Sequence, residues 1–287
     1  MAKRRAAVSE RRIPTCWRRP SCFDASPVAG RSESVVTIDV NTFVGGYPFR
    51  YVPHPDPSAL SRVLEREGID SAWVGHLPSA FYRDPTPGNH ELFSLLEKNT
   101  KLRPVPTVRP DWPRWREQLS AAADAGAPAV RAYPPQWGLG PHDPAMRELA
   151  LAAGELDIAL VLTVRFEDLR QRHALDVAGD LSAAAIRVLA RAGERVRIVV
   201  TAAGREMIEE VHWGLTTEEQ HRVWWDISWI WGPPEDHLGK LFRTIGSRRF
   251  VFGSQWPLRL VQNPRANLDL LPDDVRAMPL GTVNGDR

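Results

Sequence analysis

The sequence predicts a single α/β domain of the (β/α)8, or TIM-barrel, class. Eight short runs rich in β-branched residues recur along the chain, and amphipathic segments separate them. Successive runs begin about 25 to 38 residues apart, enough for a strand, a helix and two loops. Eight such units within 287 residues favour closure into one barrel over an open doubly wound sheet.

The predicted strands are apolar runs of four to eight residues bounded by turn-forming or charged residues, which is the usual signature of a buried parallel strand. In chain order they span residues 35–40, 71–75, 103–109, 129–133, 158–163, 196–201, 223–228 and 249–253.

Three of the intervening segments carry clear helix signals. Residues 58–68 place their leucines and valine on one face and their charges on the other, and Gly68 is a typical C-terminal stop. Asp143 precedes a proline, the usual arrangement of an N-cap and a first helical residue. The segment 180–193 runs from a capping Asp180 to a glycine.

Composition limits the function classes. The hydrophobic fraction of 43% and the charged fraction of 25% are typical of a globular protein. No apolar run reaches the roughly 18 residues that a membrane helix needs, and the basic start leads into no apolar segment of a secretory signal. We therefore expect a cytoplasmic protein with a small-molecule ligand and no membrane partner. A homo-oligomer remains compatible with the sequence.

The first 34 residues differ from the rest. They hold eight Arg or Lys and three Asp or Glu, a net charge of +5 that leaves −3 for the remainder of the +2 chain. Cys16 and Cys22 lie there without a nearby histidine, so they form neither a zinc site nor a disulfide framework. The stretch lacks interleaved aromatic residues, which argues against nucleic-acid binding. We predict a disordered basic extension at 1–34 and a barrel at 35–287.

The chemistry of a parallel barrel is carried by the C-terminal ends of its strands and the loops that follow them. The residues at which the apolar runs end are therefore the candidate site residues. They comprise two carboxylates, three arginines and one histidine among other polar and aromatic groups: Asp39, Asn41, His76, Arg109, Arg131, Tyr133, Thr163, Arg165, Thr201, Asp226, Gln255 and Trp256.

Four motifs on these strands carry a family resemblance. They are Ile38-Asp-Val-Asn-Thr-Phe-Val-Gly45, Tyr82-Arg-Asp-Pro-Thr-Pro-Gly-Asn89, Val130-Arg-Ala-Tyr-Pro134 and Phe252-Gly-Ser-Gln-Trp-Pro257. In order and spacing they resemble the amidohydrolase-related family, a superfamily of metal-dependent hydrolase barrels, over about residues 35 to 285. The resemblance implies a hydrolase or decarboxylase acting on a small molecule.

The positions at which the resemblance places metal ligands carry other residues. The first-strand His-x-His pair is replaced by Asn41 and Phe43, the fifth- and sixth-strand histidines by Thr163 and Thr201, and the eighth-strand aspartate by Gln255. Zinc prefers imidazole, thiolate or carboxylate ligands. We therefore expect no zinc and no other cofactor. The hydroxyl and amide oxygens of the replacing residues, together with the neighbouring Asp39, could hold a hard cation only weakly.

The candidate acid–base residues are Asp39, His76 and Asp226. Each also has a structural interpretation: Asp39 as an acceptor of backbone or arginine hydrogen bonds, His76 as a hydrogen-bonded pocket residue, and Asp226 as the ion-pair partner of Arg131 or Arg165. The candidate substrate-binding residues are Arg131, Arg165, Tyr133, Asn41, Thr163, Gln255 and Trp256.

Arg131 and Arg165 suggest an anionic ligand, because a guanidinium binds a carboxylate or phosphate through two hydrogen bonds. Trp137, Trp229, Trp231 and Trp256 fall on loops after strands four, seven and eight, where they would line a ligand pocket or pack the loops.

Three functional interpretations therefore remain. The first is a hydrolase or decarboxylase with a degenerate metal site. The second is a metal-free lyase, isomerase or hydrolase that uses the three acid–base candidates. The third is a catalytically inactive small-ligand-binding or scaffold relative.

Overall fold

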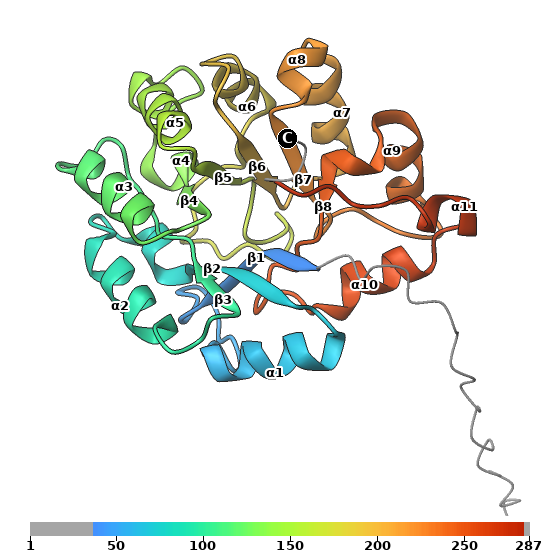
Figure 1. Ribbon diagram of the computed structural model, residues 1–287, viewed down its shortest axis with the longest axis horizontal. Helices are drawn as coiled ribbons and strands as arrows, with labels where there is room; N and C mark the ends of the chain where they lie inside the picture. Colours follow the sequence, from blue (N-terminus) through green and yellow to red (C-terminus); the bar gives the residue numbers. More distant parts are fainter. Residues whose placement is uncertain (1–36, 284–287) are drawn as a thin grey trace, which may run out of the picture. The chain divides into compact units, whose positions relative to one another are not determined.

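The computed structural model of the chain describes residues 37–283, so the predicted extension at 1–34 lies outside the described residues. Eight parallel strands alternate with helices, which confirms the predicted α/β class (Figure 1). The strands are β1 (Ile38–Val44), β2 (Ser71–His76), β3 (Leu102–Pro104), β4 (Ala129–Ala132), β5 (Ala159–Thr163), β6 (Ile198–Thr201), β7 (Val223–Asp226) and β8 (Phe250–Val251).

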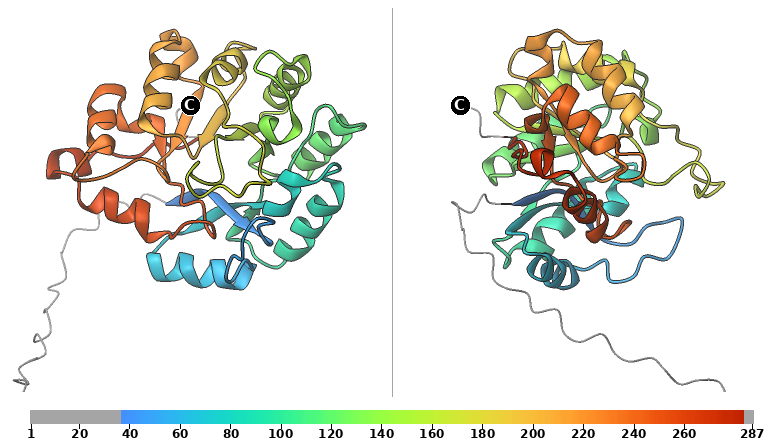
Figure 2. Two further views of the ribbon diagram at one scale, coloured as in Figure 1. Left: turned by 180° about the vertical axis from the view of Figure 1, so that it is seen from behind. Right: turned by 90° about the vertical axis from the view of Figure 1, so that its right-hand side faces the viewer.

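The strands form two parallel sheets in chain order, β1-β2-β3 and β4-β5-β6-β7-β8. Two isolated bridges link these sheets at both seams, Thr42 with Trp256 and Thr107 with Arg131. The helices surround the strands (Figures 1 and 2). They are α1 (Pro57–Glu67), α2 (Thr86–Leu96), α3 (Trp115–Asp124), α4 (Pro134–Trp137), α5 (Pro144–Glu155), α6 (Ala183–Ala190), α7 (Arg205–Trp213), α8 (Thr217–Gln220), α9 (His237–Ile245), α10 (Gln262–Asp269) and α11 (Asp273–Arg276), with 3-10 helices η1 (Leu77–Phe81) and η2 (Ser247–Arg249).

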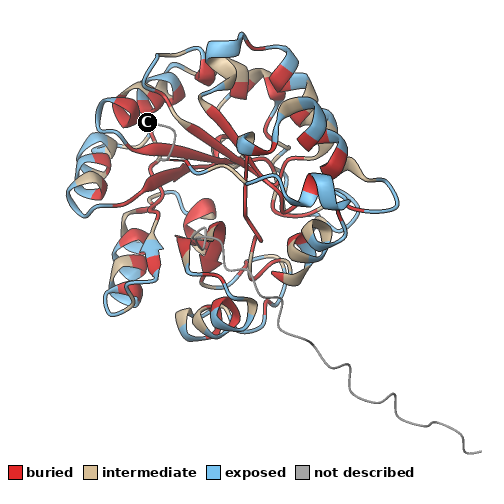
Figure 3. Cartoon of the chain, turned by 45° about the vertical axis from the view of Figure 1, so that its right-hand side comes forward, coloured by how far each residue is buried: buried red, intermediate tan, exposed pale blue. Residues whose placement is uncertain are grey.

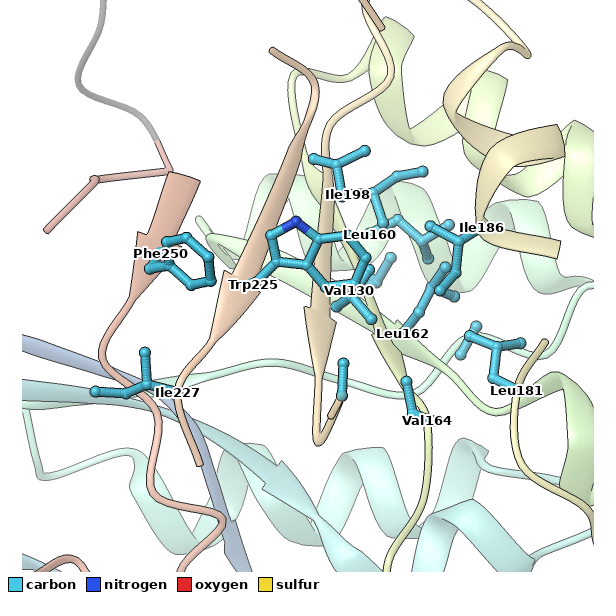
Figure 4. Close-up of a cluster of buried hydrophobic side chains, with 14 of the residues drawn as sticks. Val130, Leu160, Leu162, Val164, Leu181, Ile186, Ile198, Trp225, Ile227 and Phe250 are labelled. Carbon is cyan, nitrogen blue, oxygen red and sulfur yellow. The ribbon is translucent and has the colours of Figure 1, made fainter. Parts of the chain in front are cut away.

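Most of the core lies between the outward faces of the strands and the helices. Val130, Leu160 and Ile198 project from neighbouring strands toward this layer, where Ile186 of α6 also lies (Figure 4). Because parallel strands are covered on both faces, every strand except the short β3 is almost wholly buried (Figure 3).

The predicted helix signals hold at two of the three segments. Asp56 caps α1 by accepting a hydrogen bond from the backbone of Ala59, and Gly68 ends α1 in the left-handed conformation. Asp143 caps α5 through the backbone of Ala145, with a proline at the first helical position.

Several predicted boundaries differ from the structure, and three of the differences have a clear physical reason. The first strand continues to Val44, because its later residues pair with β2. The third strand is regular only to Pro104, since Pro104 and Pro106 lack the N–H group that a ladder needs. The helix expected at 180–193 spans only Ala183–Ala190 with Ser182 as its cap; Asp180 forms an ion pair with Arg165 instead.

Among residues 37–283, no helix combines the length and the apolar character needed to cross a membrane.

Candidate functional site

The side chains inside the barrel form three levels along the strands: an apolar level, a polar middle level and an aromatic level. Ala129 and Arg131 of β4 and Tyr133 after it belong to these three levels in turn. Ala129 belongs to an apolar group toward the N-terminal ends of the strands, together with Ala159, its partner on β5. Tyr133 belongs to a second, largely aromatic group near the C-terminal ends. Arg131 lies between the two along the strand. Because inward-facing residues alternate along a strand, the polar residues at this middle level are enclosed from both sides.

Asp226 is the centre of the middle level. One of its carboxylate oxygens, Oδ2, accepts hydrogen bonds from the Asn41 amide and the Ser228 hydroxyl, each at 2.7 Å. The other oxygen accepts one from the backbone of Ala202 at 2.8 Å. Asp226 is fully buried, and burial raises its pKa against the effect of these bonds. Its carboxylate is therefore bound by three internal partners, Asn41 on β1, Ala202 after β6 and Ser228 after β7.

Asp39 links the first strand of the barrel to the segment that follows the last strand. Its Oδ1 accepts hydrogen bonds at 3.0 Å from the backbone of Asn41 on β1 and from that of Ser254 after β8. Its Oδ2 is buried without a hydrogen-bond partner in the described chain. Complete burial raises the pKa of Asp39 to about 7, and the nearby charge of Asp226 adds to the shift. Asp39 is thus an anchor with a carboxyl group that titrates near neutrality.

Arg131 supplies the positive charge of this level. Its guanidinium donates to the Asn41 side-chain oxygen and to the Val40 carbonyl, both at 3.3 Å. It also lies 4.3 Å from the centre of the Phe43 ring. The side chain is completely buried. Burial lowers the pKa of Arg131, and the nearby carboxylate of Asp226 opposes that effect.

The residues at the metal-ligand positions do not fit a metal ion. Phe43 offers no donor atom, and both polar atoms of the Asn41 amide are used by Asp226 and Arg131. The hydroxyls of Thr163 and Thr201 bind each other at 3.0 Å. Within residues 37–283 no group of three or more His, Cys, Asp or Glu residues is arranged to hold a metal.

The aromatic group closes the middle level toward the C-terminal ends of the strands. Phe166 has its ring centre 6.1 Å from that of Phe43, 5.5 Å from that of Tyr133 and 5.3 Å from that of Phe81. Tyr47 packs on the same ring at 6.2 Å. Phe43 and Tyr133 have no exposed surface, and Phe166 retains 3%. In this structure, a solute at the mouth meets these rings before it meets Asp39 or Asp226.

A second polar group lies outside the aromatic layer, which we call the rim site: Arg165, Trp229, Gln255 and Arg259. Gln255 accepts a hydrogen bond from the Trp229 indole and donates one to the Arg165 carbonyl at 3.0 Å. Arg259 and Arg165 have their guanidinium carbons 4.5 and 5.5 Å from the centre of the Trp229 ring. The indole is therefore fixed beside two cations.

The two arginines of the rim site differ in their charge compensation. Arg165 forms an ion pair with Asp180 at 2.8 Å. No carboxylate among residues 37–283 forms an ion pair with Arg259, whose side chain is partly buried. Burial lowers the pKa of Arg259, while the more distant charges of Asp226 and Asp168 oppose this effect. Arg259 thus carries the uncompensated positive charge of the site.

The structure distributes the predicted site residues over three places. Asp39, Asn41, Arg131 and Asp226 lie in the middle level, and Tyr133 lies in the aromatic layer. Thr163 follows the β5 residue that pairs with Ala132, so it lies at the level of Tyr133 along the strands. Arg165 and Gln255 belong to the rim site, with the partly buried Trp256 next to Gln255.

His76 is separate from the other two acid–base candidates. Its ring bonds the Ser79 hydroxyl at 2.8 Å and approaches the Glu91 carboxylate at 3.5 Å. Burial lowers the pKa of His76.

Sequence reasoning missed Arg259 and Phe166. Both lie on loops rather than at strand ends, and only their closeness to Gln255 and Arg165 in the chain pointed to them.

No protein-family model matches the sequence, and no curated protein does. Solved structures with a similar fold include amidohydrolases, a hydrolase, decarboxylases and a TIM-barrel protein, and this likeness shows that the chain shares the fold of these proteins.

Three of these structures show the extent of the similarity. An uncharacterised TIM-barrel protein from Bordetella bronchiseptica is 12% identical with a TM-score of 0.59, over 84% of this chain and 94% of that one. The 5-carboxyvanillate decarboxylase from Sphingomonas paucimobilis is 14% identical with a TM-score of 0.58, over 85% and 96%. A probable 2-pyrone-4,6-dicarboxylic acid hydrolase from Acinetobacter baumannii, with citric acid bound, is 12% identical with a TM-score of 0.54, over 78% and 85%.

Proposed function

We propose that this protein binds a small carboxylate at the rim site and does so without metal-dependent catalysis. The observation that carries the proposal is the Arg259 guanidinium, which lies on Trp229 without an ion-pair partner in the described chain. A partly desolvated cation gains more from a carboxylate than an exposed one does, and a guanidinium can bind both carboxylate oxygens.

The surroundings of Arg259 favour a small ligand. Trp229 cannot turn freely, because its indole N–H is bound to Gln255, and Arg165 is held by Asp180. A site with fixed side chains loses little conformational entropy on binding. The decarboxylase and the dicarboxylic acid hydrolase of the same fold have carboxylated molecules in their names, which agrees with the class of ligand.

The inner residues favour the inactive interpretation over the catalytic ones. A general acid or base must come within hydrogen-bond reach of the substrate, and Asp39 and Asp226 have no exposed surface beneath the aromatic layer. Hydrolysis or decarboxylation of a small anion is the second candidate function. It is favoured by one observation, the raised pKa of Asp39 near 7.

Calorimetric titration with citrate and with benzoate tests the proposal. The parent protein should bind at least one of them, and Arg259→Met should weaken that binding at least tenfold, about 1.4 kcal/mol. Arg165→Met should weaken it less, because Asp180 already compensates Arg165.

Arg116→Met is the matched control. Arg116 also lies on a tryptophan, 4.3 Å from the centre of the Trp115 ring, but it is paired with Glu148. Equal losses in the Arg116 and Arg259 variants, or no binding of either anion by the parent, would refute the rim site. Turnover of a bound carboxylate that Asp39→Asn abolishes would establish the second candidate instead.

A further inference from the structure

The Arg131 side chain crosses the barrel interior from β4 to β1. Its two terminal nitrogens reach Asn41 and Val40, and its guanidinium lies against the Phe43 ring. Asn41 and Phe43 are the two first-strand positions at which the resembling family holds metal ligands. The guanidinium therefore contacts both residues that replace that histidine pair.

The barrel wall leaves room for this guanidinium. A Cβ atom on Gly75 of β2 would lie 2.8 Å from the Arg131 Nε and 2.9 Å from its Cδ, closer than side-chain carbons approach. Any larger residue at Gly75 would displace the guanidinium. The absence of a side chain at this point on β2 is thus matched to the presence of Arg131 on β4.

The same guanidinium is linked to the buried carboxylates. Asn41 accepts from Arg131 through its oxygen and donates to Asp226 through its nitrogen, so a single amide connects the two charges. Asp39 also interacts with Arg131 electrostatically. A buried carboxylate without a compensating cation is costly, and Arg131 is the cation that contacts the amide bound to Asp226.

We propose that Arg131 is the resident cation of this barrel, a built-in guanidinium that compensates Asp226 through Asn41 where the resembling barrels hold a metal. The protein then needs no metal ion for charge balance, and the guanidinium excludes one from the middle level. This inference is independent of the rim site, because it concerns residues enclosed beneath the aromatic layer.

A double-mutant cycle on the full-length protein tests the charge relationship. Arg131→Met and Asp226→Asn should each destabilise the fold, because each leaves the opposite charge uncompensated. The double variant should unfold with an equilibrium constant at least tenfold smaller than the two single effects predict when added. The cycle of Arg165→Met with Asp226→Asn is the control and should be additive. Additivity in the Arg131 cycle would overturn the proposal.

A metal measurement keeps the proposal testable even if Arg131→Met does not fold. Parent protein is prepared in the presence of Zn²⁺ and Mn²⁺, dialysed against chelator and analysed for both elements. We expect far less than one metal ion per chain. One retained Zn²⁺ or Mn²⁺ per chain, with Arg131 in place, would show that the guanidinium does not exclude a metal and would overturn the proposal.

Discussion

Replacing Asp39 by Asn should make the protein more stable at alkaline pH than the parent. Asn keeps a side-chain oxygen for the two backbone N–H groups of Asn41 and Ser254 that Asp39 binds. It removes the ionisable group whose pKa burial raises to about 7. The substitution therefore keeps the anchor and deletes the cost of a buried charge.

The size of the effect follows from linkage between proton binding and folding. The pKa of Asp39 rises from 3.8 to about 7 on folding, and one pKa unit corresponds to about 1.4 kcal/mol. The folded state binds the proton more tightly, so the contribution of Asp39 to stability is full below about pH 4. It is lost as pH rises through about 7 and reaches a deficit of about 4 kcal/mol at pH 8.

Urea unfolding of the parent and of Asp39→Asn at pH 5 and pH 8 measures this difference. The variant should gain stability relative to the parent by a few kcal/mol between the two pH values. Asp269→Asn, at an exposed position in α10, is the control and should follow the parent at both. A difference between parent and Asp39→Asn that does not change with pH would refute the reasoning.

Two further predictions concern packing and capping. Gly253→Ala should destabilise the protein by about 1 to 3 kcal/mol, because a Cβ there would lie 2.7 Å from the Asp226 carboxylate oxygen. Gly46→Ala is the control and should change little, because no atom lies within 4 Å of the added carbon. Equal melting temperatures of the two variants would contradict this prediction. Asp56→Ala should cost about 1 kcal/mol through loss of the α1 cap, measurable as a lower urea midpoint, whereas an unchanged midpoint would mean that the cap contributes nothing.

The order of the elements followed from the sequence, because eight β-branched runs at regular spacing leave few alternatives. The residues at which helices and strands begin and end were less predictable where a local sequence preference competes with another interaction. Asp180 has the sequence signature of an N-cap, but Arg165 and Arg172 lie within reach in three dimensions and form ion pairs with its carboxylate. Pro104 and Pro106 shorten β3, although its apolar pattern continues.

The polar character of the strand ends was predictable, but their partners were not. Their positions on the strands place Asn41, Arg131 and Asp226 at one level of the barrel. Whether their side chains form one hydrogen-bonded network depends on the directions in which they point, which the sequence does not give. Apart from its closeness to Gln255 in the chain, Arg259 carries no sequence signal, since a single arginine on a loop is typical of any surface. Its place in the proposed rim site rests on its contact with Trp229 and on the absence of an ion-pair partner in the described chain, which only the three-dimensional structure reveals.

The succession of Ala129, Arg131 and Tyr133 from β4 limits how this barrel can change. A histidine restored at position 43 would meet the Arg131 guanidinium, which lies 4.3 Å from the present ring. Loss of Arg131 alone would leave Asp226 uncompensated, and a side chain added at Gly75 would collide with the arginine. We therefore expect that a metal site at this level would require changes at several of these positions together. We expect each of these single substitutions to lower the free energy of unfolding.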